Sequence, residues 1–284
     1  MLHAWWFKIA AKLVLARIPL PYQMVKNLIF RNGGMDSPDY ALNTFNKHAA
    51  LAAKHGCHQG TLMEIGPGDS LLTAVYARKN GFSQVILVDH GEYAMKQLGT
   101  YAQAWEKVPW GAAVNPFSVN FASFAEMLQD LNARYLTQGV SALSGIPDNS
   151  VDFCFSQAVL EHVRFGEFDQ FAQELFRVMK PGAVSSHVVD YKDHLQAGLN
   201  NLRFSEKCWE ADWFAAGSRF YTNRLGYNRM SDMFRRAGFQ VDTLSTVKFT
   251  TLNPPKAKMA TPFNQWPDDA LLISGAHLLL TKPR

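Results

Sequence analysis

The sequence predicts an α/β protein with a Rossmann-like, mostly parallel sheet of seven strands and helices on both faces. Short apolar runs alternate with segments of helical periodicity, which is the pattern of parallel strands joined by right-handed crossovers. Hydrophobic residues make up 48% of the 284 residues, enough for a large core. We expect an N-terminal helical extension over residues 1–38 and a single domain over 39–284, with an insertion at 190–224 after the fifth strand.

The extension reads as an amphipathic helix. Its apolar run is too short to cross a bilayer, and no signal-peptide cleavage site follows it. We expect this helix to pack on the domain, and peripheral membrane contact through it is the alternative. Apolar residues recur at helical spacing against lysines: Trp5, Ile9 and Leu13 against Lys8 and Lys12.

Each strand is a short apolar run that ends at a polar or glycine-rich turn. The first runs into a glycine turn, the second (Q-V-I-L-V) ends at Asp89, and the fourth is V-D-F-C-F-S. A proline-rich loop separates the sixth from the seventh. The strands are expected at residues 61–65, 84–88, 134–137, 151–156, 183–189, 239–247 and 271–280.

The helices between them show a 3.6-residue period and recognisable ends. Lys180-Pro181-Gly182 closes one, and Gly238 stops another. They are expected at about residues 40–55, 70–79, 93–104, 122–131, 167–179 and 225–237.

The most informative motif is L-M-E-I-G-P-G-D-S-L-L at residues 62–72, where a strand enters a glycine turn and then a helix. Gly66 and Gly68 allow close backbone approach, and the helix start offers N–H groups to a ligand. Position 71 is leucine, where a dinucleotide motif has its third glycine. Glu64 and Asp69 are poor neighbours for a pyrophosphate and good ones for a cation. The ligand should therefore be positively charged.

A third acid, Asp89, ends the second strand, where a carboxylate can accept both ribose hydroxyls of an adenosine. Each acid alone has a structural alternative. Glu64 could be a capped strand end, and Asp69 could be a helix N-cap. At this spacing the three together favour a cofactor site.

This arrangement resembles the class I S-adenosylmethionine-dependent methyltransferases, specifically the broad group that includes ubiquinone- and menaquinone-type enzymes. I-P-D-N-S-V-D-F-C-F-S-Q-A-V-L-E-H-V at 146–163 is similar to that group's fourth-strand block, and L-F-R-V-M-K-P-G-A at 175–183 to its helix and fifth strand. The A-G-F turn at 237–239 also matches. The resemblance covers roughly residues 45–189 and, more loosely, 225–284.

The resemblance implies S-adenosylmethionine as cofactor and S-adenosylhomocysteine as product. The methionine and ribose portions would lie along the glycine turn, Asp89 would hold the ribose, and Gln157 would face the sulfonium. The group often has an acidic residue that binds the adenine amine, and at that place this chain has Gly139-Val140-Ser141. We therefore expect backbone groups to bind the adenine here. The expected cofactor residues are Glu64, Gly66, Pro67, Gly68, Asp69, Asp89, His90, Val140, Ser141 and Gln157.

The acceptor should bind beyond the carboxyl ends of strands four and five. A hydroxyl acceptor must lose a proton, and a histidine suits that task. We expect His194 to be the base, with Asp190 or Asp193 orienting it. His194 could instead only cap the next segment, or the three could bind Mg²⁺, which we do not favour. His187, in the middle of a strand, is expected in the core.

The insertion mixes aromatic rings with amides and arginines, which suits a sugar or another polyhydroxylated acceptor. An ordinary helical insert is the alternative. The segment is faintly similar to uncharacterised bacterial methyltransferases of surface-polysaccharide or secondary-metabolite synthesis. The expected acceptor-binding residues are His162, Arg203, Trp213 and Tyr221.

Charge and cysteine content narrow the partners. The net charge of +4 comes from scattered lysines and arginines, and no N-P-P-Y-like motif follows strand four, so no nucleic acid partner is expected. Three distant cysteines favour a reducing, cytoplasmic setting. His55, Cys57 and His58 could form a metal clip, although a polar loop is the simpler interpretation.

The expected function is methyl transfer to a hydroxyl of a small-molecule or glycan-linked acceptor. An inactive methyltransferase-like binding or scaffold protein, or an N-methyltransferase of a small metabolite, are the alternatives. The oligomeric state stays open.

Overall fold

The structure is a computed structural model that describes Trp6, Ile9 and residues 34–112, 114–215 and 220–284. Apart from Trp6 and Ile9, the expected helix of the N-terminal extension lies outside the described residues. Among the described residues, no helix has the length and apolar character needed to cross a membrane.

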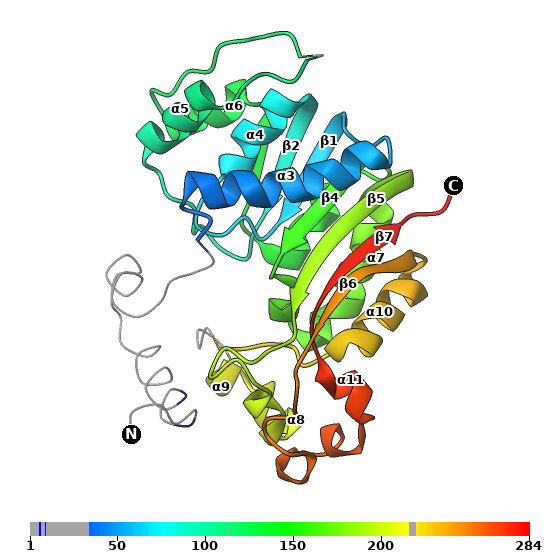
Figure 1. The fold of residues 1–284 in the computed structure, drawn as a ribbon. Helices are drawn as coiled ribbons and strands as arrows, with labels where there is room; N and C mark the ends of the chain where they lie inside the picture. The colour runs from blue at the N-terminus through cyan, green and yellow to red at the C-terminus, as the bar shows by residue number, and fades with distance from the viewer. Residues whose placement is uncertain (1–5, 7–8, 10–33, 113, 216–219) are drawn as a thin grey trace.

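A seven-stranded sheet in the order β3-β2-β1-β4-β5-β7-β6 forms the centre of the molecule (Figure 1). Pairing is parallel from β3 to β5, and β7 runs antiparallel between β5 and β6. The predicted fold class is confirmed. The strands are β1 Gly60–Ile65, β2 Phe82–Val88, β3 Ala133–Leu136, β4 Val151–Gln157, β5 Met179–Asp190, β6 Gln240–Lys248 and β7 Ile273–Thr281.

Helices cover both faces of this sheet (Figure 1). One apolar cluster joins the sheet to α3, α4, α5 and α6, and another joins its opposite face to α7 and α10. Because the inner strands β1 and β4 are covered on both sides, their side chains are almost all buried. The helices are α3 Pro38–Lys54, α4 Leu72–Asn80, α5 Leu98–Lys107, α6 Phe124–Asp130, α7 Phe168–Val178 and α10 Gly226–Ala237.

Element ends differ from the expected ones where tertiary contacts compete with helical hydrogen bonds. The helix expected from residue 93 begins at Leu98, because the preceding segment bonds elsewhere: the Met95 N–H donates to the Asp69 carbonyl at 2.9 Å. The strand expected from residue 271 begins at Ile273, after the short helix α11 (Asp268–Leu272). The helix after the glycine turn begins at Leu72, with Leu71 as N-cap, so Asp69 is not its cap.

Two irregular segments lie at the end of the sheet where β4 and β5 terminate (Figure 1). The insertion after β5 forms η4 (Asn200–Arg203), α8 (Glu206–Trp209) and α9 (Asp212–Ala215) around a small aromatic core with Trp209 at its centre. The segment between β6 and β7 adds η5 (Lys256–Lys258), η6 (Phe263–Gln265) and α11, and packs on the insertion through Leu199 and Leu202.

Candidate active site

The register of the sheet brings the predicted cofactor residues to one edge. Ile65 of β1 pairs with Val88 of β2 on one side and with Ser156 of β4 on the other. The residues that follow these three are Gly66, Asp89 and Gln157. Side chains far apart in sequence therefore leave the sheet at the same level.

The two glycines of the turn are required for different reasons. Both have positive φ, +72° at Gly66 and +65° at Gly68, where a side chain is strained. A Cβ on Gly66 would lie 2.5 Å from both methyl groups of Val159, so this glycine lets the turn pack against the segment after β4. A Cβ on Gly68 would meet nothing within 4 Å, so this part of the turn faces open space.

Asp89 is held beside the turn by two backbone donors. The Gly68 N–H donates to Oδ2 at 2.9 Å, and the His90 N–H donates to Oδ1 at 2.7 Å. Burial raises the pKa of Asp89, and these two bonds offset part of the effect. Each oxygen keeps a second lone pair, so the carboxylate can still accept a pair of hydroxyls.

Two acids of the turn are buried beneath it. Glu64 is 1% exposed and Asp69 is 2% exposed. Burial raises the pKa of Glu64 to about 8, and the charge of Asp89 adds to the rise. A buried carboxyl at the open edge of a sheet is costly unless a positive charge is placed near it.

The adenine end was expected near Val140 and Ser141, which lie in the 3₁₀ helix η1 (Gly139–Gly145). The Gly139 N–H donates to the Asp89 carbonyl at 2.8 Å, which brings this helix and His90 beside the Asp89 carboxylate. The Ser141 hydroxyl donates to the Gln138 carbonyl at 2.7 Å. For contact with an adenine ring, η1 therefore offers backbone groups and the partly buried side chain of Val140.

Taken together, these features fit S-adenosylmethionine. The open space at Gly68, the free lone pairs of Asp89 and the buried carboxyl of Glu64 match an adenosyl group that carries a positive charge. Pro67 lies between the two glycines and keeps the turn rigid.

Gln157, at the end of β4, is in contact with a residue that the sequence did not single out. His48 of α3 lies with Nε2 3.3 Å from the Gln157 Oε1 and Nδ1 2.8 Å from the Ser186 hydroxyl. Its ring stacks on Phe155, with 4.6 Å between centroids. No local motif marks His48, because its partners come from β4 and β5.

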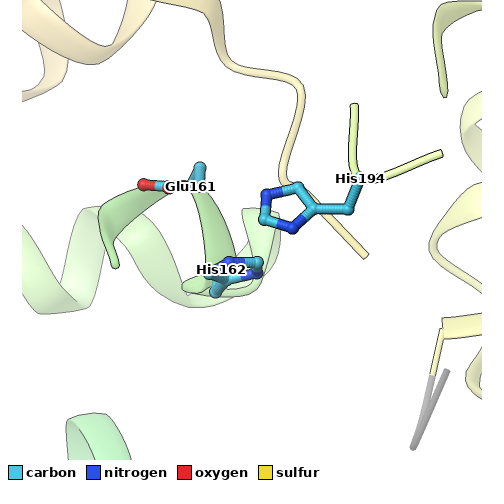
Figure 2. A group of neighbouring side chains, drawn as sticks. All are labelled: Glu161, His162 and His194. Atoms are coloured by element: carbon cyan, nitrogen blue, oxygen red, sulfur yellow. The ribbon is translucent and has the colours of Figure 1, made fainter. Parts of the chain in front are cut away.

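The predicted His162 and His194 lie together, and Glu161 is beside them (Figure 2). The two imidazole rings are 4.8 Å apart between centroids and nearly perpendicular. The side chains of both histidines are exposed, whereas Glu161 is 2% exposed. The pKa of His162 is nevertheless lowered, mainly because the protein atoms packed around its ring disfavour the charged form, and repulsion from His194 adds to this. Burial raises the pKa of Glu161 to about 8.

The last residues of the insertion hold the turn η2 (Leu160–His162) in place. The Asn223 N–H donates to the Glu161 carbonyl at 2.7 Å, and the Asn223 amide donates to the Leu160 carbonyl at 2.7 Å. His162 Nδ1 lies 2.9 Å from the Tyr221 carbonyl, so Nδ1 carries the proton and Nε2 the lone pair.

Asp190 and Asp193 bond within their own loop. The Asp193 carboxylate accepts from the backbone N–H groups of Leu195, Gln196 and Asn200. Asp190 accepts from the Lys192 N–H at 2.9 Å and lies 3.4 Å from the Lys192 ammonium. Both aspartates therefore fix the backbone on either side of His194.

The other residues expected at the acceptor differ in their surroundings. Trp213 is 60% exposed on α9, and the Arg203 Nε donates to the Asn200 side chain at 3.0 Å. Tyr221 is buried, and its hydroxyl accepts from the Phe165 N–H and donates to Glu210, both at 2.9 Å. Those contacts of Tyr221 anchor the insertion. His187, in the middle of β5, is fully buried as expected.

Comparison with known proteins agrees with this geometry. Residues 63–186 match the family model described as "Methyltransferase domain". A search of curated proteins gives no significant match.

Several solved structures resemble the chain at low sequence identity. A putative sarcosine dimethylglycine methyltransferase from Galdieria sulphuraria is 16% identical, with a TM-score of 0.48 over 89% of this chain and 92% of that one. A Methanosarcina mazei SAM-dependent methyltransferase is 17% identical, with a TM-score of 0.44 over 80% and 93%. The Burkholderia thailandensis 1,6-didemethyltoxoflavin-N1-methyltransferase is 14% identical, with a TM-score of 0.45 over 84% and 78%. Similarity of this degree does not specify an acceptor.

The strand order, the glycine turn with its acids and the matched region lead to one conclusion. Residues 63–186 are similar to a methyltransferase domain, and their glycine turn and acids fit S-adenosylmethionine, which indicates an S-adenosylmethionine-dependent methyltransferase.

Proposed function

We propose that the enzyme methylates a hydroxyl of a small-molecule or glycan-linked acceptor, with His194 removing the hydroxyl proton. The observation that carries this proposal is the exposed imidazole pair, His162 and His194, which lie together in the segments that follow β4 and β5. S-adenosylmethionine, when bound, supplies an electrophilic methyl group on a sulfonium. The chain must then position the acceptor and take its proton.

Residues of the turn would bind and orient the cofactor. Asp89 would accept the ribose hydroxyls with the lone pairs left by its two backbone bonds. Glu64 would face the positive charge of the methionine portion. Gln157, held by His48, would present its amide near the sulfonium. The remaining expected contacts, from Gly66, Pro67, Gly68, Asp69, His90, Val140 and Ser141, would fix the adenosyl group mostly through backbone atoms.

The loop around His194 would position the base. Asp193 pins the backbone that follows His194, and Asp190 pins the backbone that precedes it. The neighbouring ring of His162 has a lowered pKa and is therefore a weak base. Proton removal at the His194 imidazole leaves the acceptor oxygen able to attack the methyl carbon.

The insertion would contribute the acceptor site. Trp213 offers a large exposed ring that can stack on a sugar face, and Arg203 offers a charged donor from the same segment. Tyr221 would hold the insertion against the strand ends. We accordingly divide the chain into an extension (1–38) and one domain (39–284) that includes the 190–224 insertion.

The deciding experiment measures transfer of a labelled methyl group from S-adenosylmethionine to panels of hydroxyl and amine acceptors. We expect hydroxyl acceptors to be methylated by the wild-type chain and slowed at least tenfold in His194→Gln. Amine acceptors alone would indicate N-methyl transfer. Absence of cofactor binding by the folded chain in isothermal titration would favour a scaffold protein.

The cellular location of this activity is inferred from the cysteines. Cys57, Cys154 and Cys208 are all free thiols, which supports a reducing, cytoplasmic location. For the N-terminal extension, the proposed partner is a membrane surface that the segment contacts peripherally. No nucleic acid partner is proposed.

A further inference from the structure

We propose that Glu161, His162 and His194 together bind a divalent transition-metal ion of the zinc or cobalt type. One ligand atom from each of the three side chains lies within 4.8 Å of the other two (Figure 2). The inference goes beyond the proposed function, because binding an ion requires neither S-adenosylmethionine nor a methyl acceptor.

Glu161 is the first reason. Its side chain is 2% exposed, and neither carboxylate oxygen has a hydrogen-bond partner within bonding geometry in the described part of the chain. A buried carboxyl without partners is costly, and a cation placed beside it removes that cost. The two histidines supply donor atoms on the exposed side of the same group.

His162 is the second reason, because its ring is already arranged as a metal-binding histidine is. The proton on Nδ1 is donated to the Tyr221 carbonyl at 2.9 Å, which leaves the Nε2 lone pair available. Histidines that bind metals commonly donate their other N–H to a carbonyl in this way, which fixes the tautomer and the ring direction. The bonds from Asn223 hold the turn that carries both Glu161 and His162.

His194 completes the set from a different element. It follows β5, and its exposed imidazole ring lies 4.8 Å from the ring of His162 between centroids. Metal–ligand bonds of about 2.1 Å in a tetrahedral site place donor atoms about 3.4 Å apart, so the group closes by roughly 1 Å or somewhat more on binding. The exposed side leaves a fourth position for water or for an oxygen of the acceptor.

The ligand set selects the class of ion. Two imidazoles and one carboxylate suit zinc, cobalt and related transition metals, whereas Mg²⁺ prefers oxygen ligands. The oxygen-rich set considered from sequence, Asp190 and Asp193 with His194, is less suited, because both carboxylates already bond within their loop. An ion at the new site would occupy the His194 lone pair and so compete with the proton of the acceptor.

The test is a Co²⁺ titration of the full chain after treatment with a chelator, followed by visible absorbance, which reports tetrahedral coordination by nitrogen and oxygen. We expect one ion per chain and displacement of Co²⁺ by Zn²⁺. His194→Gln and Glu161→Gln should each weaken Co²⁺ binding at least tenfold. His194 is exposed, so its variant should fold normally, and circular dichroism checks this for both.

The matched control is His58→Gln, which removes an exposed histidine next to Cys57 and leaves the site intact. It should bind Co²⁺ as the wild type does. The proposal is overturned if the wild type binds no Co²⁺ at millimolar concentration. It is also overturned if His194→Gln and Glu161→Gln bind Co²⁺ as the wild type does. Failure of methyl transfer would leave the titration unaffected.

Discussion

Two neighbouring parts of the carboxyl end of the sheet, the cofactor edge and the acceptor edge of our proposal, are built in different ways. At the cofactor edge, one short turn supplies most of the groups, and backbone N–H donors hold Asp89 against that turn. At the acceptor edge, side chains from η2, the loop after β5 and the end of the insertion meet through long-range contacts. A site built on a local turn can be recognised as a unit from sequence, whereas the contacts between distant elements are visible only in the fold.

Both edges nevertheless bury one glutamate. The pKa values of Glu64 and Glu161 are raised to about 8 in each case, with burial as the largest cause. On our proposals, the same chemical feature serves a cationic cofactor at one edge and a metal cation at the other. The experiments below separate the two edges, from the largest expected effect to the smallest.

The largest effect is expected at the turn itself, in Gly66→Ala. The new methyl group would meet Val159 at 2.5 Å and the residue would keep a strained positive φ. We expect a loss of about 3 kcal/mol in the free energy of unfolding, measured with urea, and no detectable cofactor binding.

Gly68→Ala is the matched control, because it adds the same atom at a similar φ with open space around it. It should lose only about 1 kcal/mol. If both variants lost the same stability, the contact with Val159 would not be the reason why position 66 requires glycine.

Asp89→Ala should weaken binding of S-adenosylmethionine about 10- to 100-fold, since it removes two hydrogen bonds to a charged acceptor. Isothermal titration measures this. His194→Gln is the comparison from the other edge and should bind the cofactor normally while slowing methyl transfer. If His194→Gln loses cofactor affinity as Asp89→Ala does, the two edges are not separate sites.

At the acceptor edge, Tyr221→Phe should destabilise the chain by about 1–2 kcal/mol, because the Phe165 N–H and Glu210 lose their shared partner. Thermal unfolding measures the change. Tyr40→Phe, at an exposed position on α3, is the control and should be nearly neutral. A neutral Tyr221→Phe would argue that the insertion is anchored elsewhere.

The smallest effect is a pH dependence of stability. The folded pKa of Glu161 lies above its unfolded value, so the native state binds more protons between about pH 4.5 and 8, and stability falls as pH rises through that range. Burial lowers the pKa of His48 and of His187 to about 3, so these residues act in the opposite direction below about pH 6.5.

Between pH 6.5 and 8, the pH dependence of stability therefore reports the buried glutamates and not these two histidines. The free energy of unfolding, measured with urea, should decline with pH less steeply in Glu161→Gln than in the wild type, by up to about 1.4 kcal/mol per pH unit. Glu64→Gln should do the same, but only without S-adenosylmethionine, because the cofactor's charge would stabilise the ionised Glu64. An unchanged slope in Glu161→Gln would mean that this carboxyl is ionised in the native state throughout.

Much of the fold follows from local patterning. The strand runs, the helix that stops at Gly238 and the glycine turn are each encoded within about ten residues. The ends of α5 and β7 were not predicted, because the Asp69 carbonyl and the short helix α11 compete for the residues at those boundaries.

The candidate site divides in the same way. The sequence by itself determined the turn, the carboxylate of Asp89 and the class of cofactor, since spacing along one βαβ unit fixes where those groups emerge. Only the tertiary structure decided that His48 reaches Gln157, that Glu161 is buried and that His162 lies against His194. Those contacts join elements more than thirty residues apart, and nothing in the sequence between them specifies which distant side chains will share a strand end. Burial and hydrogen bonding in the folded chain make that selection.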